Sequence, residues 1–524
     1  MSYQKWTLMV LLVAVYFIGS SFSSSDGEQM IPVQLLGMND FHGQLETYRT
    51  VEGKKVGGAE YLAAYVKKMK EENDSTLLVH AGDMVGGSAP ISALKQDEPT
   101  VEFMNKIGFD VGTVGNHEFD EGVKEMQRLL NGGNHKKTGE FSGAAFPYTV
   151  ANVIDKKSGK PILPPYVIKK VNGIPIGFIG IVTTETKDIV LPEGIESIEF
   201  KDEVESINET VKELKGKGVQ SIVVLAHVSA SSEKDGTLPS NELVDYAPLI
   251  DDEVDVIFGG HNHQYANTIV DGKLIVESYS YGTAFSDVDL KIDPETKDIV
   301  EKKATIVQTF HDGIEPDKEI QNMVRNYGKE QSALLNQVVG YSEEAFTKHK
   351  HKGGERTLGS IIADSHRQAM NADFGFMNPG GIRADIPEGE LRWGQLYTML
   401  PFGTHLVKMN LTGSQIKDVL EQQWTGNFKT ILQPSGLHFT WIKDAPPGEK
   451  IVSVTDQDGT PINPDETYSV AITNYLATGG DGFSAFKKGT HVVSGPLTLD
   501  SFIAYIHHND GALSQPDGNR IAVR

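Results

Sequence analysis

The part of this chain that most limits its fold is a short apolar run that stops at polar, chemically active side chains. Residues 111–115 combine β-branched side chains with glycine, and Asn116, His117, Glu118 and Asp120 follow at once. A strand buried on both faces has this β-branched character, and polar groups can then appear only past its carboxyl end, where ligands bind in open α/β sheets. The stretch therefore predicts a buried strand that delivers functional side chains.

Two interpretations of the polar residues remain open at this point. In the simpler one they start a helix, with Asn116 as its cap and the acidic residues favouring its dipole. In the functional one, Asn116 offers a carbonyl oxygen to a metal and His117 offers a ring nitrogen to metal or substrate. Asp120 would then bond the other ring nitrogen of His117 across one helical turn.

The same design recurs at four further apolar runs, which favours the functional interpretation. These runs alternate with helical stretches at residues 61–70 and 99–107, a pattern typical of a layered α/β domain. The runs, each with the polar residues that follow it, are 31–38 with Asp40 and His42, 76–79 with Asp83, 221–226 with His227, and 254–258 with His261 and His263.

Together the five strand ends supply seven candidate metal ligands with hard or borderline oxygen and nitrogen donors: Asp40, His42, Asp83, Asn116, His227, His261 and His263. Such donors suit Zn²⁺, Mn²⁺, Co²⁺ or Fe. They are too many for one tetrahedral ion and suit two ions about 3.5–4 Å apart. We expect Asp83 to bridge them. In extended backbone, side chains two residues apart share a face. We therefore expect Asp40 to point the same way as His42, and His261 the same way as His263.

Composition and charge bear on partners and compartment. The 524 residues carry a formal net charge of −23, which argues against nucleic acid or an anionic membrane as a main partner. Residues 1–25 resemble a secretory signal, with Lys5 before an apolar core and a small-residue cleavage site at 21–23; an uncleaved N-terminal anchor is the alternative. Cysteine is absent, and the final residues show no hydrophobic tail for a lipid anchor. We expect a soluble secreted protein with no stable membrane anchor.

The second half of the chain has its own apolar segments and turn-rich loops, which predicts an independent core. From about residue 291 the sequence changes to charged, hairpin-like segments, and a long helical stretch follows at 315–338. Residues 378–383, 400–403 and 474–483 are loops that carry an amide, an arginine and aromatic rings. An arginine suits bidentate phosphate contacts, and two aromatics can sandwich a base for about 1–3 kcal/mol per stack. Each loop alone is also consistent with a structural turn around a buried aromatic.

The ordered motifs resemble the calcineurin-type metallophosphoesterase pattern, and Glu118-Phe119-Asp120 narrows the resemblance to the 5′-nucleotidase branch. The motifs are Asp40-Phe41-His42, Gly82-Asp83, Gly115-Asn116-His117-Glu118, His227 and Gly259-Gly260-His261-Asn262-His263. With the signal segment at 1–25 and a helical linker at 313–338, the resemblance implies a four-layered α/β/β/α domain at 30–312 and an α+β nucleotide-binding domain at 339–524.

The resemblance also implies roles for individual residues. Asp40, His42, Asp83 and His263 match the ligands of one divalent ion, while Asp83, Asn116, His227 and His261 match those of the other. His117 and Asp120 match the catalytic dyad. Asn378 and Arg383 match contacts to phosphate or ribose, Phe402 and Tyr475 match stacking residues, and Asp481 matches a partner of the ribose hydroxyls.

Two departures from the family pattern stand out. Some members carry glutamine at the position of His263, and Tyr475 replaces a commoner phenylalanine. A further arginine of the family has no clear match in residues 353–359, where Lys352 or Arg356 are the candidate substitutes. Because base and metals would lie on different domains, an interdomain rotation is expected.

The sequence thus predicts an extracellular enzyme with two divalent ions, such as Zn²⁺ or Mn²⁺, that releases phosphate from nucleoside 5′-monophosphates. The ions would generate hydroxide from water and clamp the phosphoryl oxygens. ADP, ATP and UDP-sugars are further candidate substrates. A 2′,3′-cyclic-nucleotide 2′-phosphodiesterase/3′-nucleotidase is the nearest alternative, and a non-catalytic secreted binding protein is the alternative of another class. The preferred base and the oligomeric state are left open.

Overall fold

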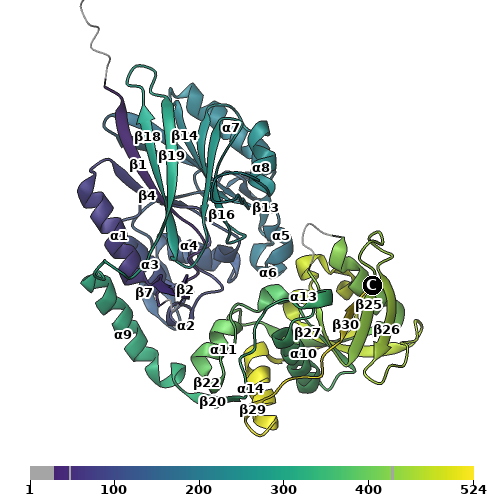
Figure 1. Ribbon diagram of the computed structural model, residues 1–524. Coiled ribbons are helices and arrows are strands. Elements are labelled where there is room, and N and C mark those ends of the chain that lie inside the picture. The colour runs from purple at the N-terminus through teal and green to yellow at the C-terminus, as the bar shows by residue number, and fades with distance from the viewer. Residues whose placement is uncertain (1–28, 47–48, 426–429) are drawn as a thin grey trace, which may run out of the picture.

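The computed structural model describes residues 29–46, 49–425 and 430–524, and the predicted signal segment at 1–25 lies outside them. The chain forms two α/β domains, drawn in purple to teal and in green to yellow (Figure 1). No helix within the described ranges combines the length and the hydropathy needed to cross a membrane.

Two six-stranded sheets form the centre of the first domain. One has the order β19 (Ile299–Gln308), β18 (Ala284–Ile292), β1 (Ile31–Met38), β4 (Thr76–His80), β5 (Val111–Thr113) and β8 (Tyr148–Thr149). The other has the order β11 (Tyr166–Val171), β12 (Ile174–Val182), β14 (Ser221–His227), β15 (Val254–Phe258), β17 (Lys273–Ser278) and β16 (Tyr265–Val270).

Apolar side chains hold these sheets face to face and cover their outer surfaces with helices. Val111 of the first sheet and Phe178 and Val223 of the second belong to one buried cluster between the sheets. Helices α1 (Ala59–Glu72) and α3 (Glu98–Ile107) share a core with the first sheet, and α7 (Glu203–Gly216) and α8 (Glu242–Tyr246) share one with the second. The predicted α/β/β/α layering is therefore confirmed.

Parallel pairing brings the carboxyl ends of the inner strands to one edge of the domain. Met38 at the end of β1 pairs with His80 at the end of β4, and His80 in turn pairs with Gly112 of β5. In the second sheet Leu225 of β14 pairs with Phe258 at the end of β15. Side chains that follow these five strands therefore start from neighbouring positions.

Helix α9 (Lys318–Leu335) connects the two domains and packs against α1 and α3. Gln331 donates from Nε2 to the carbonyl of Ile91 at 3.0 Å, so the helix is fixed to the first domain. The next residues belong to the second domain, because Trp393 N donates to the Gln337 carbonyl at 2.9 Å. We propose that the division into 30–312, 313–338 and 339–524 follows this change of partners.

The second domain is built on a five-stranded sheet with α10 (Thr357–Met370) packed against it. The strand order is β24 (Gln433–Ser435), β21 (Phe374–Met377), β27 (Thr467–Thr473), β23 (His405–Thr412) and β28 (Thr490–Leu497). It has buried clusters of its own, which include Phe376 and Ile472 in one and Ile361 and Leu396 in another. This is the predicted α+β domain.

His366 of α10 makes the stability of the fold depend on pH. Its ring is fully buried, with Nδ1 donating to the Phe376 carbonyl at 3.0 Å, while Nε2 has no hydrogen-bond partner in the described part of the chain. Burial lowers the pKa of His366 from 6.5 to about 4. Below pH 6.5 His366 is protonated in the unfolded chain but stays neutral in the folded chain. The free energy of unfolding therefore falls as the pH falls towards 4.

Through His366, we expect the free energy of unfolding of the wild type to fall by about 2 kcal/mol between pH 6.5 and 5. His366→Gln, which keeps a donor for Phe376, should not show this decrease. The measurement is the urea midpoint of the full chain at both pH values, with a chelator present so that metal release adds nothing. The exposed His508→Gln is the matched control. Equal pH slopes for the wild type and His366→Gln would contradict this assignment.

Candidate metal centre and substrate cavity

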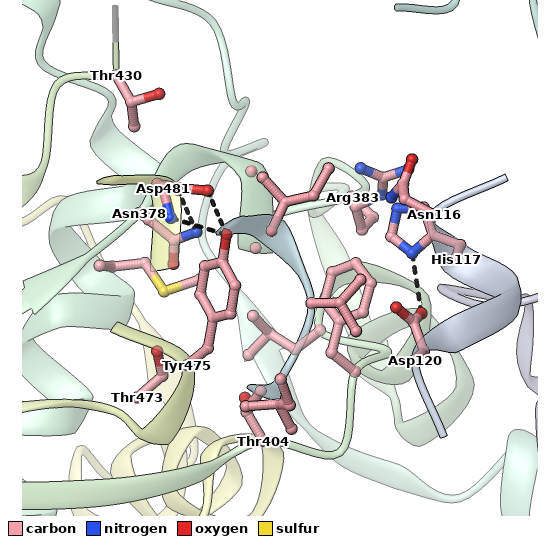
Figure 2. A pocket seen from close by; sticks show the side chains of 18 of the residues that line it. Asn116, His117, Asp120, Asn378, Arg383, Thr404, Thr430, Thr473, Tyr475 and Asp481 are labelled. Atoms are coloured by element: carbon pink, nitrogen blue, oxygen red, sulfur yellow. Dashed lines mark hydrogen bonds and ion pairs between the residues drawn. The ribbon is translucent and has the colours of Figure 1, made fainter. Parts of the chain in front are cut away.

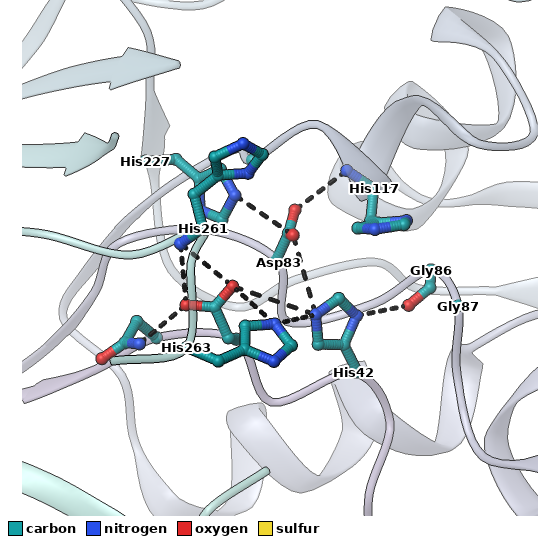
Figure 3. A network of polar contacts seen from close by, with 12 residues as sticks. His42, Asp83, Gly86, Gly87, His117, His227, His261 and His263 are labelled. Carbon is teal, nitrogen blue, oxygen red and sulfur yellow. Dashed lines mark hydrogen bonds and ion pairs between the residues drawn. The ribbon is translucent and has the colours of Figure 1, made fainter. Parts of the chain in front are cut away.

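The seven predicted ligand side chains meet at the shared edge of the two sheets. Figure 3 shows Asp83 between His227 and His42. Asp83 Oδ2 lies 3.7 Å from His42 Nε2 and 3.1 Å from His227 Nε2. On one side His263 Nε2 lies 3.3 Å from Asp40 Oδ1 and 3.2 Å from His42 Nε2. One carboxylate therefore faces both halves of the cluster.

The donors divide into two groups that share this middle. Asp40, His42 and His263 lie within reach of one point, and Asp83, His227 and His261 lie within reach of another. His42, Asp83 and His117 form a third group, which shares one residue with each of the other two. The side-chain oxygen of Asn116 lies 3.1 Å from His227 Nε2 and 2.9 Å from His261 Nδ1, so it belongs with the second group. The family resemblance would place one ion in each of the first two groups, and metal binding by these residues stays a prediction.

The chemistry of the donors fits two divalent cations. His42 and His227 are fully buried, and their Nδ1 atoms contact the backbone carbonyls of Gly86 at 2.8 Å and Ala81 at 2.9 Å. With Nδ1–H donating to those oxygens, each ring points its Nε2 atom towards the buried carboxylates, and in its neutral form that atom offers a lone pair to a cation. Lone pairs gathered around carboxylates repel one another unless cations lie between them.

The backbone conformation that brings the ligand side chains together differs from the expected extended one. The pairs Asp40/His42 and His261/His263 were expected to share faces of extended backbone, but all four residues have positive φ, at 51°, 50°, 86° and 61°. Asp83 also lies in the left-handed region, with φ at 51°. The extended-backbone expectation was wrong because the strands end before the ligands, and tight left-handed turns aim the side chains inward.

Glu118 holds two of these turns together, a role that the sequence did not indicate. Its buried carboxylate accepts the backbone N–H groups of Asp83 at 3.0 Å, Met84 at 2.8 Å and Gly115 at 2.5 Å. Burial, followed by the charge of Asp83, raises the pKa of Glu118 to about 7. A side chain on Gly115 would not fit, since its Cβ would lie 2.2 Å from Asp83 Oδ1.

The helix-start interpretation of this stretch is not what the structure shows. A single 3₁₀ turn, η1 (His117–Phe119), begins here, and the side chain of Asn116 makes no cap hydrogen bond. As expected, His117 Nδ1 lies 2.8 Å from Asp120 Oδ2 across that turn. Burial lowers the pKa of His117, but Asp120 and Asp83 outweigh it and leave the pKa above its usual value.

A cavity of about 380 Å³ opens from this centre and is lined by both domains (Figure 2). The first domain contributes His117, Asp120 and the apolar residues 189–191. The second contributes all five residues predicted to bind substrate, which are Asn378, Arg383, Phe402, Tyr475 and Asp481. In Figure 2 Tyr475 and Asp481 lie across the cavity from His117 and Asp120.

Within the cavity these five residues make contacts that sequence reasoning did not indicate. Tyr475 Oη donates to Asp481 Oδ1 at 2.5 Å, and Asn378 Nδ2 donates to Asp481 Oδ2 at 2.8 Å. Asn378 therefore faces the carboxylate expected to hold the ribose, while the tyrosine hydroxyl fixes the same carboxylate. The Phe402 ring lies nearly parallel to His117, with 5.6 Å between centroids and 15° between planes.

Lys352 and Arg356 were the candidate substitutes for the additional arginine of the family. The Lys352 side chain lies outside the described part of the structure. The Arg356 guanidinium donates to the Lys348 carbonyl, and Arg356 is not among the residues that line the cavity. Arg383 is therefore the arginine that the structure brings to the cavity.

Two further residues support predicted ligands and were missed. Asn39 donates from Nδ2 to Asp40 Oδ2 at 2.7 Å, and its oxygen accepts from Ser278. Glu185 Oε2 lies 3.6 Å from His261 Nε2. Adjacency to Asp40 was a signal for Asn39, whereas only the folded chain brings Glu185 to residue 261.

Comparison with known proteins agrees with this arrangement. Residues 33–265 match the family described as Calcineurin-like phosphoesterase, and residues 338–488 match the 5′-nucleotidase, C-terminal domain. The cell wall protein Lmo0130 of Listeria monocytogenes is 36% identical over 575 residues, covering 99% of this chain and 73% of that protein. The endonuclease YhcR of Bacillus subtilis is 41% identical over 537 residues, covering 99% of this chain, and the chain spans 44% of its length.

A solved structure extends the similarity to the whole architecture. The 5′-nucleotidase precursor from Thermus thermophilus superimposes with a TM-score of 0.81 at 26% identity, covering 94% of this chain and 99% of that one. Both domains and their arrangement are therefore shared with a protein of that description.

Replacement of Asp83 by alanine tests the centre directly. Because this carboxylate faces both groups of donors, we expect Asp83→Ala to lose at least one of two divalent ions after dialysis, as measured by elemental analysis. Asp74→Ala, an exposed acidic residue on the same domain, should keep both. Full occupancy in a folded Asp83→Ala protein would show that the carboxylate does not bridge.

Proposed function

Because the chain belongs to the 5′-nucleotidase family of calcineurin-like, metal-dependent phosphoesterases, we propose that it hydrolyses nucleoside 5′-monophosphates to nucleoside and phosphate. One observation carries the proposal: a single cavity joins the metal-type donor cluster to loops with an arginine, aromatic rings and the half-buried carboxylate of Asp481. Donors for cations and groups suited to a nucleoside thus face the same space.

The proposed metal ligands are Asp40, His42, Asp83 and His263 for one ion, and Asp83, Asn116, His227 and His261 for the other. When bound, two such ions activate water and balance the charge of the phosphoryl group. The chain holds the donors ready through contacts of its own: Gly86 and Ala81 fix the rings of His42 and His227, and Asn39 fixes Asp40.

We assign His117 and Asp120 to the reacting phosphate. Asp120 fixes the ring through Nδ1 and also accepts the Gly87 N–H at 3.0 Å, so neither side chain can turn away easily. The two neighbouring carboxylates favour the protonated ring. A protonated His117 can stabilise charge on the phosphoryl oxygens and give its proton to the departing ribose oxygen.

The second domain would select the nucleoside. Arg383 supplies a guanidinium for phosphate, and Phe402 and Tyr475 supply faces for the base. Asp481 keeps acceptor capacity for ribose hydroxyls, since each of its oxygens takes one hydrogen bond from Tyr475 or Asn378. Together these groups offer partners for the phosphate, the ribose and the base of one nucleotide.

We also propose that the protein acts outside the cell or at its surface. The signal-like segment at 1–25 and the similarity to a protein described as a cell wall protein support this location. Zn²⁺ and Mn²⁺ are both compatible with the mixed nitrogen and oxygen donors.

A nucleotide panel separates the proposal from its rivals. With Mn²⁺, Zn²⁺ or Mg²⁺ supplied in turn, we expect chelator-sensitive phosphate release from AMP at a higher kcat/KM than from 3′-AMP or 2′,3′-cyclic AMP. Preference for the last two would favour a 2′,3′-cyclic-nucleotide 2′-phosphodiesterase/3′-nucleotidase. Absence of chelator-sensitive release from all three would favour a non-catalytic binding protein.

The dyad is tested by removing the imidazole. The His117 ring is bonded to Asp120, and the bond from residue 117 to the ligand Asp83 comes from the backbone N–H, which alanine keeps. We therefore expect His117→Ala to retain two ions and lose about 10²–10⁴-fold in kcat. Metal content by elemental analysis and a thermal midpoint accompany the kinetics. A variant that is metal-free and poorly folded would show that the ring has a structural role instead.

A further inference from the structure

Strand β17 supplies none of the seven candidate ligands, although its carboxyl end reaches the same edge of the second sheet. It pairs in parallel with β15, which precedes the ligands His261 and His263. Glu277 near the end of β17 is fully buried and does not line the substrate cavity. Burying an acidic side chain is costly unless its oxygens are bonded, so the partners of Glu277 indicate its role.

Both carboxyl oxygens of Glu277 accept backbone N–H groups, and the two donors belong to different ligand loops. Oε1 accepts the N–H of Gln264 at 2.9 Å, and Gln264 directly follows His263. Oε2 accepts the N–H of Ala230 at 3.0 Å, in the loop that begins at His227. One side chain therefore connects the 227–230 loop and the 260–264 loop, the two ligand loops of the second sheet.

The backbone of the 260–264 loop depends on such contacts. Its two histidines have left-handed backbone, with φ of 86° at His261 and 61° at His263. Non-glycine residues keep this conformation only where surrounding contacts enforce it. The N–H of Gln264 is shared between Glu277 and Asn262 Oδ1, which lies 3.0 Å away in the same loop. Glu277 is thus the partner that ties this loop to the neighbouring one.

Glu277 resembles Glu118, which connects two ligand loops of the first sheet through the N–H groups of Asp83 and Gly115. Burial, followed by the charge of Asp40, raises the pKa of Glu277 well above its usual value, and the two N–H groups lower it in part. Each oxygen keeps a lone pair for its N–H in either protonation state. The connection between the loops therefore does not require the ionised form.

We propose that Glu277 is a positioning residue of the metal centre, which holds the histidines of the 227–230 and 260–264 loops in place for both ions. The inference rests on the proposed ligand set and adds a residue that acts only through the backbone of its neighbours. His227 and His261 are assigned to one ion and His263 to the other, so the loss of Glu277 should affect both. Removing such a supporting partner typically weakens metal binding by about 10–100-fold.

The test measures metal binding by the full chain after treatment with a chelator. Glu277→Met removes both acceptors and keeps the length of the side chain, whereas Glu277→Gln keeps one acceptor. We expect the Mn²⁺ affinity, measured by calorimetric titration, to be about 10–100-fold weaker in Glu277→Met, with a smaller loss in Glu277→Gln. The visible absorption of bound Co²⁺ should also change in Glu277→Met, because it reports the arrangement of the ligands.

Glu421→Met is the matched control. Glu421 is also buried and accepts two backbone N–H groups, from Lys450 at 3.0 Å and Ile451 at 2.7 Å, but it lies in the second domain. Both methionine variants should lower the thermal midpoint of the metal-free protein, and only Glu277→Met should weaken Mn²⁺ binding. Wild-type Mn²⁺ affinity in a folded Glu277→Met protein, or an equal loss in Glu421→Met, would overturn the inference.

Kinetics separate positioning from a general role in folding. In Glu277→Met we expect kcat for AMP to fall at limiting Mn²⁺ and to recover when Mn²⁺ is in excess. KM should stay within about twofold of wild type, because the groups proposed to bind the nucleoside lie on the second domain. A loss of kcat that excess Mn²⁺ does not restore would assign Glu277 to the fold alone. A wild type that binds two ions without hydrolysing AMP would instead overturn the proposed function, and the Mn²⁺ affinities would still decide the role of Glu277.

Discussion

The arrangement of the centre depends on one buried carboxylate. Glu118 follows the first-sheet strand β5, yet it accepts N–H groups from the turn after β4 as well as from its own loop. It thereby fixes Asp83, whose oxygen faces both groups of donors. A buried carboxylate is costly unless its oxygens are bonded, and here the backbone of two ligand loops supplies the bonds. The same contacts that satisfy Glu118 therefore hold Asp83 in its left-handed turn.

The sequence was most informative where chemistry recurs in a regular pattern. Asp40 and Asp83 follow buried strands and His227 ends one, and parallel pairing of such strands brings their carboxyl ends to one common edge. The structure places all seven candidate ligands at that edge, although their binding of metal stays a proposal. The layered fold followed from the same alternation of strands and helices.

What the sequence did not reveal depends on contacts between distant residues or on local backbone strain. Positive φ at His261 and His263 cannot be read from their spacing, because non-glycine residues adopt it only where surrounding contacts enforce it. Glu185 lies beside His261 only in the folded chain. Asp481, which accepts the hydrogen bond of Tyr475, has a φ of 54°, and the loop sequence does not reveal this conformation.

The attachment of α9 fixes where the molecule can bend. Gln331 is bound to Ile91 of the first domain, whereas the carbonyls of Asn336 and Gln337 accept hydrogen bonds from Arg392 and Trp393 of the second. A swing of the second domain must therefore pivot within the last turn of the helix, between these two anchors. Phe402 of the second domain stacks on His117 of the first, so a rotation at that pivot would part the two rings and widen the mouth of the cavity.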